Sequence, residues 1–134
     1  MEILNLIFEP CNWSWGLIVK HIQESLGKEF EVETREYYSW CKKPQSRGLI
    51  LSQNVTQLPH IPWPRKTISR LGGNMSFTDA RAPVFLDLIS KCAAVVATNS
   101  YLEKIGLSVN AHTTLIPNGL NLDTWKAKRV VNGE

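Results

Sequence analysis

The sequence predicts one α/β domain, built on a parallel sheet with helices on both faces. Short apolar segments typical of buried strands alternate along the chain with segments whose apolar residues recur at helical spacing. Right-handed crossovers between parallel strands place the intervening helices on the two sides of the sheet. The length of 134 residues suits a single domain and excludes a second full one.

The beginning of the chain already shows the order strand, helix, strand. Residues 3–8 form a nearly continuous apolar run, which is typical of a strand covered on both faces. A helix is predicted next, because apolar residues then recur at helical spacing as far as a natural stop at Gly27. Residues 30–35 alternate apolar and charged side chains, so they predict a strand with one wetter face, near an edge of the sheet.

The middle of the chain predicts two more strands around a proline-rich segment. Residues 48–51 and 67–71 have the apolar character of short strands. Between them, residues 58–64 contain three prolines, each of which removes a backbone donor. We therefore expect this segment to be a loop without regular structure.

The last third predicts two further helix–strand units. A helix is expected within residues 79–91, with Pro83 in its first turn, and a strand at residues 93–97. Ser100 and Glu103 have the spacing of a capping box, which predicts a short helix ending by Gly106. A strand at residues 113–116 completes a Rossmann-like domain spanning residues 1–125, and residues 126–134 are predicted to be a polar tail or the start of an interdomain linker.

Composition and missing motifs exclude several functions. The net charge of +3 comes from dispersed basic residues, which does not predict nucleic-acid binding. The three cysteines have neither CxxC spacing nor partner histidines, so we expect no metal and no disulfide. Neither a signal peptide nor a membrane-spanning run is predicted, which favours a cytoplasmic protein. The sequence also lacks GxGxxG, P-loop, HExxH and GxSxG motifs, so it predicts no cofactor and no catalytic residue.

The candidate binding residues follow the predicted strands. In open parallel sheets, ligands bind beyond the carboxyl ends of the strands. The segments at these ends are uncharged, rich in amide and hydroxyl groups, and close to tryptophans. Such groups suit a neutral polyhydroxylated ligand such as a sugar, although the same residues are common in loops, caps and cores. The candidates are Trp13, Trp15, Gly16, Asn54, Gly73, Asn74 and Asn99.

Two segments near the end of the chain carry a family resemblance. Residues 92–102 read CAAVVATNSYL, and residues 114–125 read TLIPNGLNLDTW. Together they resemble the N-terminal domain of GT-B fold glycosyltransferases of the glycogen-synthase-like, family-four type. The turn departs from the family pattern, with Asn121 in place of aspartate and Trp125 in place of phenylalanine. Residues 68–74 show a weaker similarity to the fourth strand of the family and its following glycine.

The resemblance implies two Rossmann-like domains that face each other across a cleft and need no metal. The first domain binds a carbohydrate or glycosylated acceptor, and the second binds the nucleotide-sugar donor. We expect this chain to supply only the first, with the donor-binding domain in cis or as a separate subunit, and to be inactive alone. The resemblance places Gly16 where a donor phosphate or an acceptor hydroxyl approaches, and we expect Trp13 or Trp15 to stack on the acceptor.

Two other functions remain open from the sequence. A non-catalytic Rossmann-like module could use residues 58–64 as a protein-docking surface, because exposed aromatic and proline clusters often mark interfaces. A flavodoxin-like domain that binds a small nucleotide needs phosphate-cradling Ser, Thr or Gly residues after the first strand. Residues 11–15 supply such groups poorly.

Overall fold

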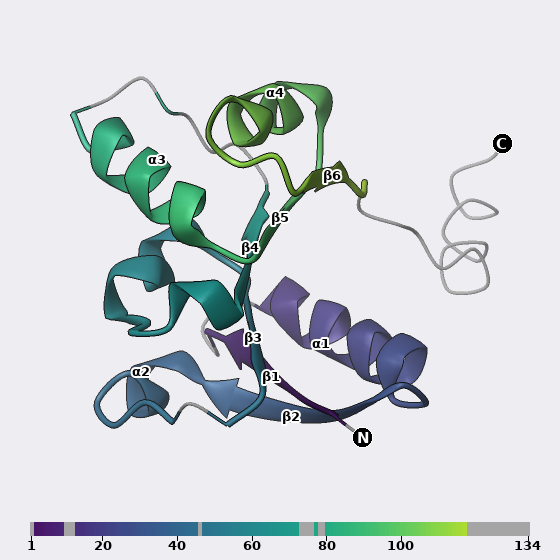
Figure 1. The fold of residues 1–134 in the computed structure, drawn as a ribbon. Helices are drawn as coiled ribbons and strands as arrows, with labels where there is room; N and C mark the ends of the chain where they lie inside the picture. Colours follow the sequence, from purple (N-terminus) through teal and green to yellow (C-terminus); the bar gives the residue numbers. More distant parts are fainter. Residues whose placement is uncertain (1, 10–12, 46, 73–76, 78–79, 118–134) are drawn as a thin grey trace, which may run out of the picture.

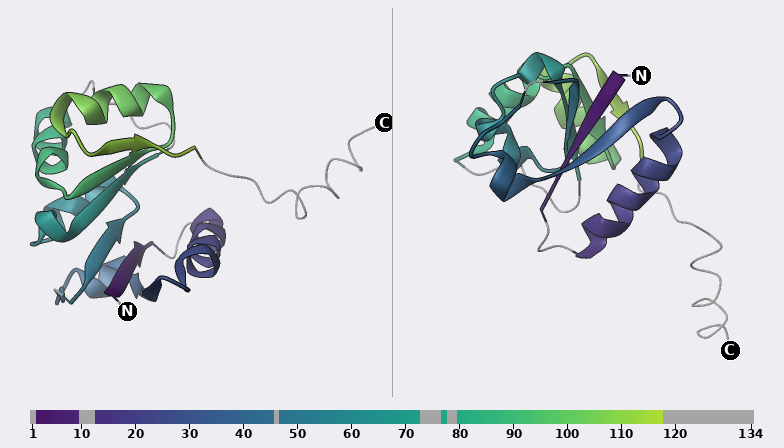
Figure 2. Two further views of the ribbon diagram at one scale, coloured as in Figure 1. Left: turned by 45° about the vertical axis from the view of Figure 1, so that its right-hand side comes forward. Right: turned by 90° about the horizontal axis from the view of Figure 1, so that it is seen from below.

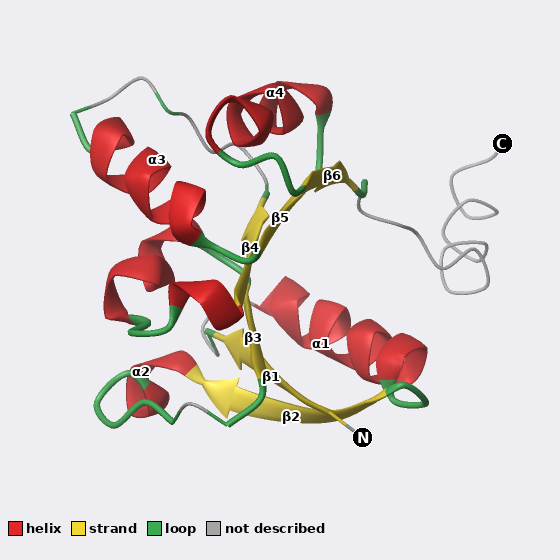
Figure 3. Cartoon of the chain, viewed as in Figure 1, coloured by secondary structure: helices red, strands yellow, loops and turns green. Residues whose placement is uncertain are grey.

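The computed structural model describes residues 2–9, 13–45, 47–72, 77 and 80–117, with backbone only for residues 13–19. Strands and helices alternate along these residues (Figure 3). The strands are β1 (Glu2–Phe8), β2 (Phe30–Glu36), β3 (Leu49–Ser52), β4 (Thr67–Leu71), β5 (Ala94–Ala97) and β6 (Thr113–Leu115). The helices are α1 (Trp13–Leu26), α2 (Tyr37–Trp40), the 3₁₀ helices η1 (Val55–His60) and η2 (Pro64–Lys66), α3 (Ala82–Lys91) and α4 (Ser100–Val109).

The six strands form one all-parallel sheet in the order β2-β1-β3-β4-β5-β6 (Figure 1). The chain runs outward from β1 to β2 at the sheet edge, crosses back over β1 to β3, and then continues in one direction to β6. This confirms the predicted Rossmann-like α/β fold and the edge position of β2. The direction of winding reverses between β1 and β3, which is the topological switch point of the sheet.

Helices cover both faces of the sheet, as the sequence predicts. Figures 1 and 2 show α1 on one face and α2, η1 and α3 on the other. Helix α4 packs against α3, β5 and β6. The helix positions follow from the strand order, because right-handed crossovers in opposite directions from the switch point lead to opposite faces.

The two faces of the sheet differ in burial. Strand residues on the face that carries η1 and α3 are fully buried, namely Ile50, Ser52, Thr67, Ser69, Leu71, Val95 and Ala97. Their neighbours on the face that carries α1 are half-buried, namely Leu49, Leu51, Ile68, Arg70, Ala94 and Val96. The hydrophobic core therefore lies between the sheet and the helices α3, α4 and η1.

The proline-rich segment is more regular than the sequence predicts. Residues 55–60 and 64–66 form the 3₁₀ helices η1 and η2, and Pro59 lies inside the first. Short 3₁₀ helices have few internal bonds, so one missing proline donor leaves the neighbouring bonds intact. Gln57 N–H donates to Asn54 O (2.9 Å), and Ile61 N–H donates to Leu58 O (3.1 Å). The expectation of an irregular loop over residues 58–64 was therefore wrong for residues 58–60 and 64.

The predicted bounds of α4 were also wrong. Asn99, not Ser100, is the N-cap, because its side-chain oxygen accepts a hydrogen bond from Leu102 N–H at 2.9 Å. The helix continues through Gly106 to Val109. Gly106 is buried, and a Cβ atom added there would lie 2.6 Å from Thr113 Cγ2. This glycine lets the helix approach β6 closely and does not end it.

Glycine is required at the entrance to β3. Gly48 has a φ of 82°, and a Cβ atom there would lie 2.3 Å from the carbonyl oxygen of Ile3. The buried side chain of Asn5 holds the same corner, because its Nδ2 donates to Arg47 O (2.5 Å) and Leu49 O (3.1 Å). The backbone of β3 is thereby fixed against β1.

Replacement of Gly48 by alanine should lower the free energy of unfolding by about 1–3 kcal/mol, because it combines a strained φ with a backbone clash. Urea denaturation measures this change. Arg47→Ala is the matched control, since the Arg47 side chain is exposed and its bonded carbonyl stays; we expect a change of at most about 0.5 kcal/mol. Equal changes in the free energy of unfolding for the two variants would contradict the requirement for glycine at position 48.

The thiol of Cys92 should make stability depend on alkaline pH. Cys92 borders a cavity of about 30 Å³ with Leu58, Ile61, Pro64, Thr67 and Leu88, and burial raises its pKa from 9.0 to about 11. The folded state holds the thiol proton of Cys92 more tightly than the unfolded state does. The protonated thiol therefore contributes to the free energy of unfolding fully below pH 9, and this contribution is lost as pH rises toward 11. Cys92→Ala should flatten the decline in unfolding free energy over that range, measured by urea denaturation. If the unfolding free energy of Cys92→Ala declined with pH as steeply as that of the unchanged protein, the prediction would be contradicted.

Candidate functional site

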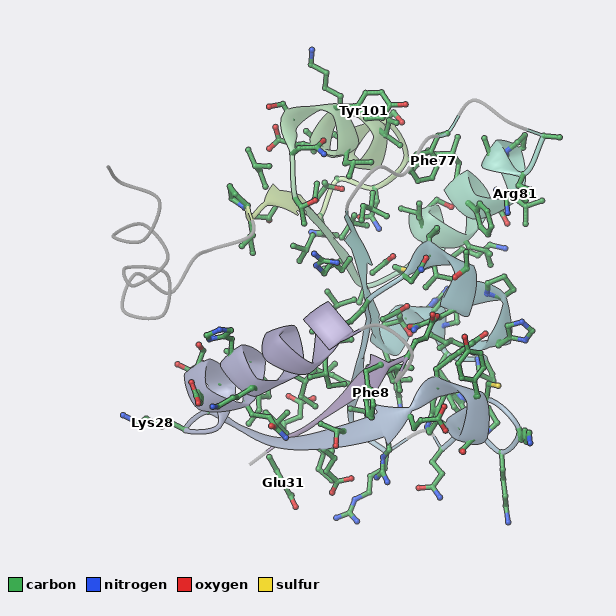
Figure 4. The ribbon with its side chains drawn as sticks, turned by 180° about the vertical axis from the view of Figure 1, so that it is seen from behind. Phe8, Lys28, Glu31, Phe77, Arg81 and Tyr101 are labelled. Carbon is green, nitrogen blue, oxygen red and sulfur yellow. The ribbon has the colours of Figure 1, made fainter. Side chains whose placement is uncertain are left out.

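The carboxyl ends of β1 and β3 lie side by side at the switch point of the sheet. Residue 9 follows β1, residues 53 and 54 follow β3, and α1 is the first helix after β1. In open α/β sheets this position forms the crevice in which ligands bind. The side chains around it determine which ligand chemistry is possible, and Figure 4 shows the region from behind, with Phe8 labelled at the end of β1.

A chain of polar side chains joins β1, β3 and η1 at this edge. Gln57 Nε2 donates to Glu9 Oε1 at 3.4 Å, and the Ser52 hydroxyl lies 2.9 Å from Gln57 Oε1 and 3.0 Å from the carbonyl oxygen of Asn54. Ser52 and Gln57 are fully buried. Buried polar groups that bond to one another fix the positions of the segments that carry them. The chain thus forms a rigid base below the switch point.

Gln53 is the exception in this region. Its side chain is 2% exposed, and within the described part of the chain neither Nε2 nor Oε1 has a hydrogen-bond partner. An unsatisfied buried polar group costs about 1–3 kcal/mol, so native proteins keep few of them. The amide of Gln53, at the carboxyl end of β3, is therefore a buried polar group that no described residue satisfies.

The next strand brings a cation to the same edge. Arg70 lies on β4, and a Cβ atom added at Gly72 would stand 2.6 Å from its Nη1 and 2.9 Å from its Cζ. The guanidinium therefore lies beside Gly72, at the carboxyl end of the strand. The residue is half-buried, and burial lowers the pKa of Arg70 below its ordinary value.

The ends of β4 and β5 are tied to each other. The carbonyl oxygen of Leu71 accepts hydrogen bonds from both Thr98 N–H and Thr98 Oγ1, each at 3.1 Å. Asn99 follows directly and caps α4. The double bond at Leu71 fixes the end of β4 relative to the start of α4.

The candidate residues predicted from the sequence have different positions in the structure. Asn54 caps η1, because its Oδ1 accepts from Thr56 N–H at 3.1 Å, and Asn99 caps α4. These two asparagines follow β3 and β5, with β4 between them, so they do not form one cluster. Trp13, Trp15 and Gly16 lie in the first turn of α1, where the description covers the backbone alone; Gly73 and Asn74 lie outside the described residues.

Sequence reasoning placed Glu9 and Gln53 in the segments that follow the strands without selecting either as a binding residue, and it missed Gln57 and Arg70. A signal for Arg70 was present, because a lone charged residue interrupts the apolar pattern of a predicted internal strand. Gln53 stands next to the candidate Asn54, but no local pattern distinguishes a bonded glutamine from an unpartnered one. Gln57 lies in η1, a 3₁₀ helix that the sequence did not predict.

The described residues hold no metal site, and an open depression lies away from the switch-point edge. Among them, no group of three or more His, Cys, Asp or Glu side chains could hold a metal ion. No helix in the described part of the chain has the length and apolar character to cross a membrane.

A shallow, open depression of about 480 Å³ lies at the amino end of β2, lined by Gln23, Gly27, Phe30, Glu31 and Val32. It is therefore at the opposite end of the sheet from the switch-point edge.

The cap assigned to Asn99 can be separated from a binding role. Asn99→Ala should lower the free energy of unfolding by about 1 kcal/mol, because it removes the oxygen that accepts from Leu102 N–H. Asn99→Asp keeps that acceptor and should retain most of the stability, which thermal denaturation followed by circular dichroism would show. Equal destabilisation by both variants would mean that the amide nitrogen matters to the fold.

Comparison of the chain with protein-family models, with curated protein sequences and with solved structures found no match of any of these kinds. The fold assignment therefore rests on the strand order and crossovers. The functional assignment rests on the chemistry of the switch-point edge.

Proposed function

We propose that this chain is the acceptor-side domain of a glycosyltransferase. It binds a carbohydrate acceptor at the switch-point edge, and a donor-binding domain, in cis or as a separate subunit, binds the nucleotide sugar. The observation that supports the proposal is the buried amide of Gln53, whose donor and acceptor have no hydrogen-bond partner among the described residues. The resemblance of residues 92–102 and 114–125 to family-four glycosyltransferases supports the same function.

The chemistry of the edge favours a hydroxylated ligand. Each sugar hydroxyl both donates and accepts, so a pair of neighbouring hydroxyls can satisfy both atoms of an amide such as Gln53. The bonded chain of Ser52, Gln57 and Glu9 keeps the surrounding backbone in place while the ligand binds. The price of an unpaired amide in the free protein is recovered when the ligand supplies the missing partners.

The chain alone is proposed to position the acceptor and not to transfer the sugar. Holding two reactants in the reactive geometry supplies a large part of a transfer barrier, and the departing diphosphate requires electrostatic stabilisation. In this proposal the donor-binding domain provides that stabilisation. Glu9, the carboxylate at the switch point, accepts from Gln57 and serves here to fix the base of the site.

The alternative of a docking module that uses residues 58–64 has less support. Leu58 and Ile61, its two aliphatic side chains, are 4% and 6% exposed and belong to the core. Trp63 is half-buried and packs against the same cluster. The side chains left on the surface are those of Pro59, His60 and Pro62, which offer little apolar area to a partner.

An NMR titration with simple saccharides tests the proposal. Glucose, galactose, mannose and their disaccharides at millimolar concentration should shift the backbone amides of Gln53, Asn54, Gly72, Thr98 and Asn99. The amides that line the depression at the other end of the sheet, those of Gln23, Gly27, Phe30 and Glu31, are the internal control and should not move. Shifts confined to the control amides, no shift across the panel, or hydrolysis or transfer from nucleotide sugars by the chain alone would contradict the proposal.

A further inference from the structure

We propose that the outer border of β2 is a docking surface for an extended basic segment of a partner protein, which pairs with β2 as one more strand of the sheet. The surface consists of the backbone of Phe30–Glu36 and the open depression beside its first residues. This inference goes beyond the proposed function, because it concerns a protein partner and a part of the sheet that the carbohydrate site does not use.

The backbone of β2 can pair along its whole length. Within the described part of the chain, β1 is the only strand that pairs with β2, and it does so over seven consecutive residues in one unbroken parallel register. Successive residues of a strand direct their N–H and C=O groups to opposite sides, so alternate residues of β2 present these groups to the outside. Figure 1 shows β2 along the lower border of the sheet.

The two borders of the sheet differ in their suitability for pairing. The strand at the other border, β6, has three residues and is soon followed by Pro117. Short edge strands and prolines are common devices against unwanted strand pairing. β2 has seven residues, and neither a proline nor a bulge interrupts it. The longer border is therefore the one that can hold a partner strand.

A hollow accompanies the outer border of β2. The depression of about 480 Å³ is lined by Gln23 of α1, by Gly27 and by three consecutive residues of β2, namely Phe30, Glu31 and Val32. Consecutive residues of a strand alternate between the two faces of a sheet, so a depression that all three line extends over the border of the strand. The inner border is occupied by β1. Side chains of an added strand therefore have space beside the first residues of β2.

The charge around this border selects a basic occupant. Glu2 and residues 20–36 contribute six of the 12 acidic residues of the chain but three of its 15 basic residues, although the whole chain has a net charge of +3. A second copy of the chain would bring the same acidic border against this one, and like charges on facing strands repel each other. A strand of opposite charge is complementary to the border.

The two faces of β2 determine the residue pattern of the partner. Phe30 and Val32 line the depression together with α1, and Glu31 alternates to the other face. The carboxylate of Glu33 forms an ion pair within the strand, and that of Glu36 caps α2. Glu31 is exposed, and Figure 4 shows it directed away from the sheet. A partner that alternates apolar and basic residues places the former over the depression and the latter beside Glu31.

A synthetic peptide of seven residues that alternates valine and lysine, with blocked ends and a fluorescent label, tests this pattern by fluorescence anisotropy. It should bind at least about tenfold more tightly than the peptide in which glutamate replaces lysine, because only lysine is complementary to the border. Its binding should weaken as the salt concentration rises from about 50 mM to about 500 mM. Equal affinity for the two peptides, or no binding up to roughly 1 mM peptide, would overturn the inference.

Backbone methylation separates strand pairing from attraction between charges alone. One peptide is methylated on the amide nitrogen of every lysine and another on that of every valine, so both keep the charge and the side chains. Only alternate N–H groups of a strand face its neighbour, so one methylated peptide should lose at least about tenfold in affinity and the other should retain most of it. Equal affinities of the two methylated peptides would show that no strand is added.

Variants of the chain locate the peptide. Glu31→Lys should weaken binding of the valine–lysine peptide about tenfold, because attraction becomes repulsion. The matched control is Glu103→Lys on α4, which packs beside the other border of the sheet and should leave the affinity unchanged. Gln23→Trp fills the depression from an exposed helical position, so it should weaken binding without a fall in the thermal midpoint. Unchanged affinity in both Glu31→Lys and Gln23→Trp would place the peptide elsewhere and overturn the inference.

Amide hydrogen exchange distinguishes a partner strand from a second copy of the chain. The peptide should slow exchange at alternate residues of Phe30–Glu36 and leave the amides of Thr113–Leu115 unchanged. If exchange in β2 slowed without peptide as the protein concentration rose, and sedimentation showed a dimer, the occupant would be a second copy and the inference would be wrong. The saccharide titration gives an independent result, so failure of the proposed function leaves this test unaffected.

Discussion

The packing of one face of the parallel sheet against η1, α3 and α4 is the interaction on which the rest of the molecule depends. The strand residues on this face are fully buried, and they join Ile89 of α3 and Leu102 of α4 in one apolar cluster. Burial of this face fixes the order and register of β3, β4 and β5. The opposite face is half-buried along the same strands, so it contributes less to holding them together. Polar and charged side chains such as Arg70 can therefore occupy it.

This asymmetry separates stability from ligand chemistry along single strands. On β4, Thr67, Ser69 and Leu71 point into the core, while Ile68 and Arg70 alternate to the other face. A side chain on the second face can be selected for what it binds, because the core does not constrain its size and polarity. The same separation holds after β3, where Ser52 belongs to the buried polar chain and Gln53 has no hydrogen-bond partner among the described residues.

The sequence predicted the elements better than their ends or their contacts. Residues 3–8, 30–35 and 67–71 were predicted as strands from hydrophobic pattern, and β1, β2 and β4 confirm them, because burial on a sheet leaves a direct trace in the order of side chains. The short helix α2 was missed. Its cap is Glu36, whose carboxylate accepts from the N–H groups of Tyr38 and Ser39, and a glutamate before an aromatic pair is not a usual start signal. Gly106 was taken for a stop because its close contact with Thr113 is a tertiary feature.

The candidate site shows the same limit. Composition directed attention correctly to the carboxyl ends of the strands, but it could not distinguish an asparagine that caps a helix from a glutamine that lacks a partner. Asn54 and Asn99 use their oxygens in caps, a role that their position before a helix predicts as well as any other. Whether the amide of Gln53 has a hydrogen-bond partner depends on neighbours that only the fold brings to it, and one sequence without its fold does not contain that information.

The double hydrogen bond at Leu71 has a mechanical consequence for this edge. Since one carbonyl oxygen receives both donors of Thr98, the tip of β4 cannot be displaced without pulling on the tip of β5 and, through the adjoining cap, on the first turn of α4. Strain applied beside Gly72 is thus shared by two strands and a helix. The tips of β4 and β5 and the first turn of α4 therefore move together.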